Sequence, residues 1–190
     1  MPRFASPMAL IALALVTILP GCDKSDLKDV VKHDTDPEHV PTVVTHNVQT
    51  VISDSGRTRY RITAPLWNMF EEAKSPHWTF PQGAVAEELD EQFHVVSSIK
   101  CDSAHFDVPQ NLWSLNGNVN ITTLEGDRIL TDQMFWNTAV HEFYSDAFIH
   151  LEKQDRVIEG YGYRSNEQLT KYELRRVSAI LPVDDSKMPH

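Results

Sequence analysis

The chain has 190 residues, which is enough for one domain with a buried core and short appendages. Its 27 acidic and 17 basic residues give a net charge of -10, which argues against a nucleic-acid-binding protein because such proteins present a basic surface. Its two cysteines, Cys22 and Cys101, are too few for a disulfide framework.

The N-terminus has the features of a secretory signal. Arg3 supplies a positive charge, and residues 8–19 form an uncharged apolar run, shorter than the roughly 18 residues that a membrane-spanning helix needs. The next residues, Leu-Pro-Gly-Cys, resemble the lipobox of bacterial lipoproteins, in which the cysteine is lipidated and becomes the mature N-terminus. We therefore predict a signal peptide over residues 1–21 and a lipid on Cys22; an ordinary signal peptide with an incidental cysteine is the alternative.

Residues 22–41 are expected to form a polar tether, because they carry mixed charges and no aromatic side chain. Asp23, directly after the cysteine, resembles an inner-membrane retention signal of lipoprotein sorting. A lipid anchor of two or more acyl chains holds a protein stably at a membrane without a transmembrane helix. The segment thus predicts a protein tethered to the inner membrane.

From residue 42 to residue 183 the chain shows the alternation that is typical of β-strands. In residues 113–122 the apolar side chains fall on one side and the polar ones on the other. Turn signals separate the strands, as at residues 124–127, where Gly126 can take a positive φ. No long segment has helical periodicity, so the pattern indicates an all-β sandwich, barrel or stack of strands.

Two segments fit this pattern less well. Prolines and charges interrupt the alternation over residues 66–92, so the course of this region is not predicted. Residues 184–190 are expected to be a disordered tail.

The strands also repeat at a fixed offset. Residues 113–121 match residues 143–151, thirty positions later, and Asp102 matches Asp132 at the same offset. A period of this length with two strands per unit indicates units that stack on their neighbours. Gly83 and Gly117 occupy equivalent places, where we expect the strand to bend or bulge.

Several segments, in this order and spacing, resemble the LptC family, the membrane-anchored periplasmic component of the lipopolysaccharide export machine. They are Asp102–Asp107, Leu115–Val119, Leu130–Asp132, Trp136-Asn137, Tyr144–Asp146 and Ile158–Gly162. Many members of that family carry a transmembrane helix at the N-terminus, whereas this chain has the lipobox.

The resemblance implies an open β-jellyroll, a folded-over stack of antiparallel strands with an apolar trough that holds the acyl chains of lipopolysaccharide. The residues expected to line this trough are Tyr60, Ile62, Trp113, Leu115, Val119, Ile121, Met134, Trp136, Phe143, Ile149 and Leu151.

The resemblance also implies partners at the two edges of the sheet. The N-terminal edge strand would meet the inner-membrane ABC transporter core, and the C-terminal one a soluble, LptA-like bridge protein in the periplasm. The residues expected on these edges are Val44, Val48, Tyr172, Leu174 and Ile180.

Catalytic, cofactor and metal sites are not expected. Cys101 and His105 share a strand face without further ligands nearby, so a buried thiol is the preferred interpretation. Asp102 with Asp107, or Asp132 with Asp146, could form a pair of carboxylates for glycoside hydrolysis, but their recurrence with the repeat favours a turn or edge role. Arg57, Arg59 and Arg61 share another face; we interpret it as solvated, with contact to phosphates of a glycolipid as the alternative.

Three functions are compatible with this sequence. The preferred one is a non-enzymatic component at the periplasmic face of the inner membrane, which receives lipopolysaccharide from the transporter and passes it to the next bridge domain. The second is a structural or adhesive β-sandwich lipoprotein on the outer cell surface. The third is a hydrolase, which the lack of a convergent acid–base set disfavours.

Overall fold

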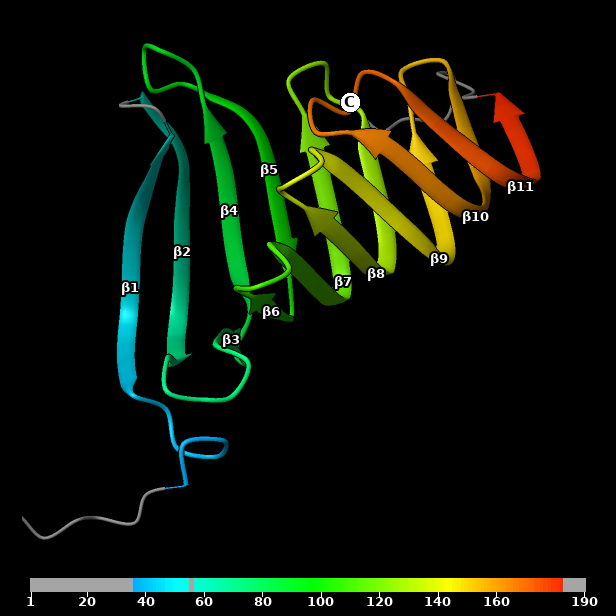
Figure 1. Cartoon of the computed structure of the whole chain (residues 1–190). Coiled ribbons are helices and arrows are strands. Elements are labelled where there is room, and N and C mark those ends of the chain that lie inside the picture. Colours follow the sequence, from blue (N-terminus) through cyan, green and yellow to red (C-terminus); the bar gives the residue numbers. More distant parts are fainter. Residues whose placement is uncertain (1–35, 55–56, 183–190) are drawn as a thin grey trace, which may run out of the picture. The chain divides into compact units, whose positions relative to one another are not determined.

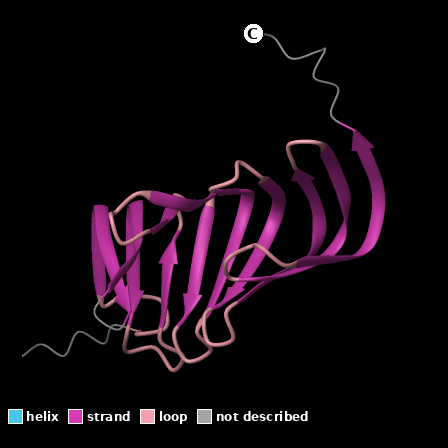
Figure 2. Cartoon of the chain, turned by 90° about the horizontal axis from the view of Figure 1, so that it is seen from above, coloured by secondary structure: helices cyan, strands magenta, loops and turns pink. Residues whose placement is uncertain are grey.

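The structure is a computed structural model that describes residues 36–54 and 57–182. These residues form a single antiparallel sheet and include no helix (Figures 1 and 2), so the predicted all-β fold is confirmed. The strands are β1 (Val43–Asp54), β2 (Arg57–Phe70), β3 (His77–Phe80), β4 (Ala84–Leu89), β5 (Val95–Cys101), β6 (Ser103–Asp107), β7 (Leu112–Thr123), β8 (Arg128–Asn137), β9 (Glu142–Glu152), β10 (Arg156–Asn166) and β11 (Tyr172–Pro182).

The predicted signal peptide, Cys22 and the tail at 184–190 lie outside the described residues. Of the predicted tether, residues 36–41 are described, and they contact the turn after β2. The Glu38 carboxylate accepts a hydrogen bond from the Lys74 backbone N–H at 2.8 Å. Within the described ranges there is no helix with the length and apolar character needed to cross a membrane.

The connectivity is an antiparallel meander in which two long strands are interrupted. Strands β3 and β4 both pair with β2, β3 along residues 68–70 and β4 along residues 60–63. Likewise β6 pairs with β3, β5 pairs with β4, and both pair with β7. The region over residues 66–92, which the pattern left open, thus continues β2 and then forms β3 and β4.

A line of irregularities crosses the sheet at the middle of these long strands. Between β7 and β8 the register shifts at Asn116/Val119, and between β8 and β9 it shifts at Thr131/Phe135. Gly83 and Gly117 lie on the same line with φ of 88° and 74°, a conformation that glycine adopts without the steric cost of a Cβ. The predicted bends at these two glycines are confirmed.

This line divides the sheet into two parts, which we call leaves. The first leaf contains β4 and β5, the second leaf contains β3 and β6, and the long strands run through both. The inner faces of the leaves meet: the rings of Tyr60 in the first leaf and Trp136 in the second have centroids 5.3 Å apart. Side chains from both leaves form one apolar core, as expected for a folded-over, jellyroll-like sheet.

Pro65 shows how the sequence accommodates the bend. His46 pairs with Leu66 and Val48 pairs with Ala64, so the intervening residues Asn47 and Pro65 are left out of the ladder. Proline has no backbone N–H to donate, and it is tolerated where the ladder is interrupted. Its presence in the sequence therefore marks the fold line rather than the end of a strand.

Candidate functional site: an apolar trough between the leaves

A row of aromatic side chains covers the inner face of the second leaf. Neighbouring rings have centroids 4.7 to 6.4 Å apart. The register brings most of them together, because each ring lies opposite the next across a strand pair, as Trp113 lies opposite Trp136. The members, on β2, β3, β6, β7, β8 and β9, are Trp67, Trp78, Phe106, Trp113, Trp136 and Phe143.

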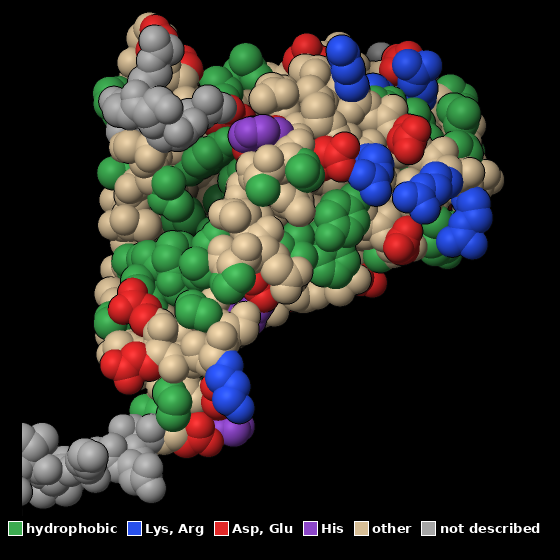
Figure 3. All heavy atoms as spheres, in the orientation of Figure 1, with side chains coloured by type: hydrophobic (Ala, Val, Ile, Leu, Met, Phe, Trp, Pro, Cys, Tyr) green, Lys and Arg blue, Asp and Glu red, His purple; other side chains and the backbone are tan. Residues whose placement is uncertain are grey.

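Four members of this row, Trp78, Phe106, Trp113 and Trp136, form one wall of a cavity of about 460 Å³, which we call the trough. The opposite wall comes from the first leaf and from β1, and Thr138, His141 and Glu167 lie at the rim. Figure 3 shows hydrophobic side chains gathered over β2 and β4, which carry part of that wall. The residues of the two walls are Ile52, Tyr60, Ile62, Ala86, Trp78, Phe106, Trp113 and Trp136.

The predicted lining residues fall into two groups. Tyr60, Ile62, Trp113 and Trp136 line the trough, and Phe143 lies next to it, lining a narrow continuation with Tyr60 and Trp136. The other six belong to the same apolar core but do not line the trough: Leu115, Val119, Ile121, Met134, Ile149 and Leu151. Contact between lipid and any of these residues stays a prediction.

Seven lining residues were not predicted: Ile52, Trp78, Ala86 and Phe106 in the walls, and Thr138, His141 and Glu167 at the rim. For two of them the sequence carried a signal. Phe106 precedes Trp136 by the repeat offset, and residues 78–85 echo residues 112–119 in aromatic and glycine positions. Trp78 and Ala86 lie within residues 66–92, where the alternation is interrupted, so their strands were not predicted.

Two polar features stand out in the apolar surroundings of the trough. The indole N–H groups of Trp67 and Trp136 are buried without a hydrogen-bond partner among the described residues. The Glu167 carboxylate, whose side chain is 8 % exposed, accepts a hydrogen bond from the Tyr60 hydroxyl at 2.9 Å and lies 2.7 Å from His141 Nδ1. The rim of the trough therefore holds one satisfied carboxylate, and the Trp136 indole N–H is buried in the wall beside it.

Burial shifts the pKa of two ionisable groups near the core. Burial raises the pKa of the Cys101 thiol, which keeps it protonated and unreactive at neutral pH. Burial likewise raises the pKa of Tyr163 to about 12. Among the residues that the structure describes, no three His, Cys, Asp or Glu side chains gather as a metal site would require.

Of the three arginines on one strand face, only Arg61 has a described side chain. Its Nε lies 2.7 Å from a Glu87 carboxylate oxygen on the neighbouring strand. An arginine that already has a carboxylate partner is a poor phosphate ligand, so this contact favours the interpretation of a solvated outer face.

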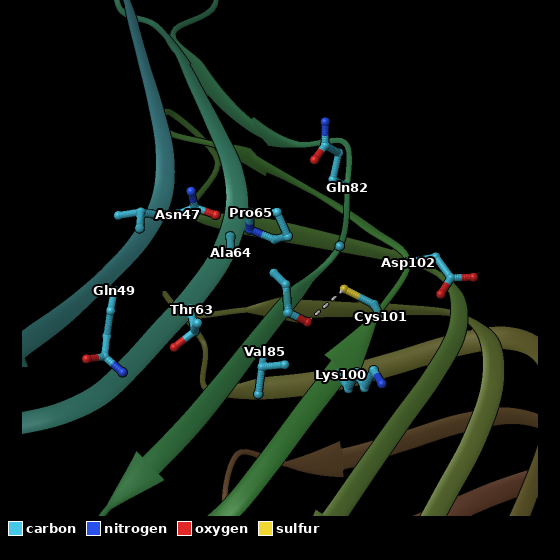
Figure 4. A pocket seen from close by; sticks show the side chains of 13 residues that line it. Asn47, Gln49, Thr63, Ala64, Pro65, Gln82, Val85, Lys100, Cys101 and Asp102 are labelled. Carbon is cyan, nitrogen blue, oxygen red and sulfur yellow. Dashed lines mark hydrogen bonds between the residues drawn. The ribbon is translucent and has the colours of Figure 1, made fainter.

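A second cavity, of about 770 Å³, lies at the fold line, where β2 and β4 separate beyond Thr63 (Figure 4). It contains both polar and apolar side chains, among them Gln82, Lys100 and Asp102, and the Cys101 thiol faces the Ala84 carbonyl within it. Asp102 accepts a hydrogen bond from the Asn118 amide at 2.6 Å, which ties the β5–β6 interruption to the bulge of β7. The acidic residue thus supports the bend.

The edges of the sheet lie where the sequence placed them. Within the described strands, β1 pairs only with β2 and β11 pairs only with β10. Apolar side chains remain open on both edges, with Val44 49 % and Ile180 62 % exposed. The edges therefore present unpaired backbone groups beside apolar side chains, which is a template for another strand.

Comparison with known proteins points to one family. The family model described as LptC, "Lipopolysaccharide-assembly, LptC-related", matches residues 8–179. This range contains all the residues that line the trough and most of β11. No curated protein matches the chain significantly.

Proposed function

Because the chain belongs to the LptC-related family of lipopolysaccharide-assembly proteins, and hence takes part in lipopolysaccharide transport, we propose that its trough holds the acyl chains of lipopolysaccharide during transfer. The observation that carries this proposal is a cavity of about 460 Å³ between two apolar walls, in a family of periplasmic, inner-membrane-associated transport components. The protein acts as a carrier and not as an enzyme.

The chemistry of the trough suits acyl chains. Removing apolar surface from water contributes about 25 cal/mol per Å² without directional bonds, so chains of different length can bind and can slide. The wall from the second leaf is aromatic, and the wall from the first leaf includes a small side chain, Ala86, which leaves room for the ligand.

The edges supply the partners in this proposal. Strand β1 follows the tether and would pair with the inner-membrane ABC transporter core, from which the protein receives lipopolysaccharide. Strand β11 would pair with a soluble periplasmic bridge protein, to which the lipid passes. Addition of a strand to each edge aligns the trough with those of its neighbours, because the inner face continues across the added strand.

Site-specific photo-crosslinking in cells tests the lipid-binding proposal. A photoreactive residue at Ala86, on the inner face of β4, should capture lipopolysaccharide. The same residue at Glu87 should not, since Glu87 lies on the opposite face of the strand and contacts Arg61. Equal capture at both positions, or capture at neither, would contradict a lipid-filled trough.

The same method tests the direction of transfer. A photoreactive residue at Val44 should capture a subunit of the transporter, and one at Ile180 should capture the bridge protein. The opposite pairing of positions and partners would mean that the polarity is reversed.

The lipid anchor at Cys22 is also part of the proposal. Replacing Cys22 with alanine should abolish incorporation of a labelled fatty acid and leave the protein unprocessed or released from the membrane, because the lipobox chemistry requires the thiol. Labelling that survives the substitution would exclude this cysteine as the attachment site; Cys101, which is buried, is the control position.

A further inference from the structure

The turn between β10 and β11, residues 167–171, bridges the two leaves, and we call it the strap. It leaves the second leaf at Asn166, and the Glu167 backbone N–H donates to the His141 carbonyl at 2.9 Å in the turn between β8 and β9. The Glu167 side chain then reaches Tyr60 of the first leaf, and Leu169 packs against the core. The strap therefore connects parts of the sheet that are far apart in the meander.

Residues of the strap line three neighbouring cavities of the inner face. On one side is the trough, and on the other is a cavity of about 350 Å³ lined by Thr123, Lys153 and Tyr172 near the C-terminal strands. A pocket of only about 20 Å³ shares Tyr60 and Trp136 with the trough and Ser97 and Leu169 with the second cavity, and we interpret it as the passage between them. Glu167 and Leu169 both line this passage, so the strap narrows it.

Hydrogen bonds hold the strap together, but the backbone of one of its residues is strained. The Asn166 side chain accepts a hydrogen bond from the Lys171 N–H at 2.8 Å and donates to Gln168 and Thr170, which holds the turn together as a unit. Leu169 nevertheless has a φ of 57°, a region that leucine rarely adopts. Packing of its side chain against the core maintains this conformation, so a ligand that displaces Leu169 would also release the strain.

We propose that the strap is a gate between the trough and the second cavity, with the Glu167 carboxylate as its latch. This inference rests on the proposed function, because it concerns the path of the same acyl chains. Lipid that enters near β1 fills the trough, and it reaches the β11 end when the Tyr60–Glu167 hydrogen bond and the Leu169 contact give way. The gate would keep lipid in the trough until transfer proceeds.

Two variants test the gate. Tyr60→Phe keeps the aromatic ring but removes the hydroxyl that donates to Glu167. Exchange of the Glu167 amide hydrogen, measured by NMR, should become faster by roughly tenfold, the factor expected for one lost hydrogen bond to a charged group. Leu169→Gly removes the leucine side chain from the passage and relieves the backbone strain. The ratio of lipid crosslinking at Thr123 to lipid crosslinking at Ala86, each measured with a photoreactive residue at that position, should therefore increase several-fold.

Val140→Gly is the control, since Val140 is a 59 % exposed residue of the neighbouring turn and lines none of these three cavities. It should change neither measurement. Unchanged Glu167 exchange in Tyr60→Phe, or an unchanged Thr123-to-Ala86 ratio in a folded Leu169→Gly protein, would overturn the gate while leaving lipid binding intact. Absence of lipid at Ala86 in every variant would instead overturn the proposed function and the gate with it.

Discussion

Replacing Gly83 with alanine should lower the free energy of unfolding by about 2–4 kcal/mol, because the substitution combines an unfavourable backbone conformation with a clash. Gly83 has a φ of 88°, and a Cβ at this position would lie 2.8 Å from the Cys101 carbonyl oxygen. The obstacle is the backbone at the end of β5, at the fold line, so it cannot rotate away as a side chain would. Chemical denaturation of the wild-type protein and of the Gly83→Ala variant measures this difference in the free energy of unfolding.

Gly126→Ala is the matched control. Gly126 has a φ of 85°, but a Cβ there would meet nothing within 4 Å. The Gly126→Ala substitution should lower the free energy of unfolding by about 1 kcal/mol, because alanine disfavours a positive φ and no clash is added. If both substitutions cost the same, the clash at the fold line does not contribute to stability, and the bend tolerates more movement than its geometry indicates.

Replacing Ala86 with phenylalanine should reduce lipopolysaccharide crosslinking about tenfold or more, which corresponds to 1.4 kcal/mol of binding free energy, with little loss of stability. Ala86 is partly buried on the wall of the trough, so the added ring occupies space that ligand would fill. Lipid capture is measured with a photoreactive residue at position 78, in place of Trp78 on the opposite wall. Stability is measured as the melting temperature.

Ile149→Phe provides the contrast, because Ile149 lies in the closed part of the same inner surface and is 0 % exposed. Overpacking a filled core typically costs about 1–3 kcal/mol, so this variant should melt at a lower temperature while each folded molecule still captures lipid. An Ile149→Phe protein that keeps its stability but loses lipid would show that the trough extends into the region that is closed in this structure.

Much of the fold could be predicted from the sequence, because strands and turns are specified locally. The hairpin turn at residues 124–127 has a glycine with positive φ, as predicted. The offset of 30 residues corresponds to a pair of strands, since β7 and β9 begin at Leu112 and Glu142. The family also followed from short segments, each weak alone, whose order and spacing matched.

The alternation in β8 could not be interpreted from the sequence, because the fold line changes its phase. Ile129 and Thr131 point inward before the register shift, and Met134 and Trp136 point inward after it, so the spacing across the bend is three residues. In β7 the corresponding step, from Leu115 to Val119, is four residues. An irregularity in a long strand depends on its partner strand, which a local pattern does not contain.

The sequence by itself determined the strands, the turns and the family, and it determined which side chains face inward wherever the alternation is unbroken. Only the tertiary structure decided which inward side chains fill a closed core and which border the trough. Ile149 and Trp113 have the same alternation and apolar character, yet only Trp113 lines the trough. The physical reason is that alternation shows only which face of a strand a side chain lies on. Whether the space beyond that side chain is filled depends on the distance to the opposite leaf. It also depends on the strap, which brings Glu167 from another part of the chain.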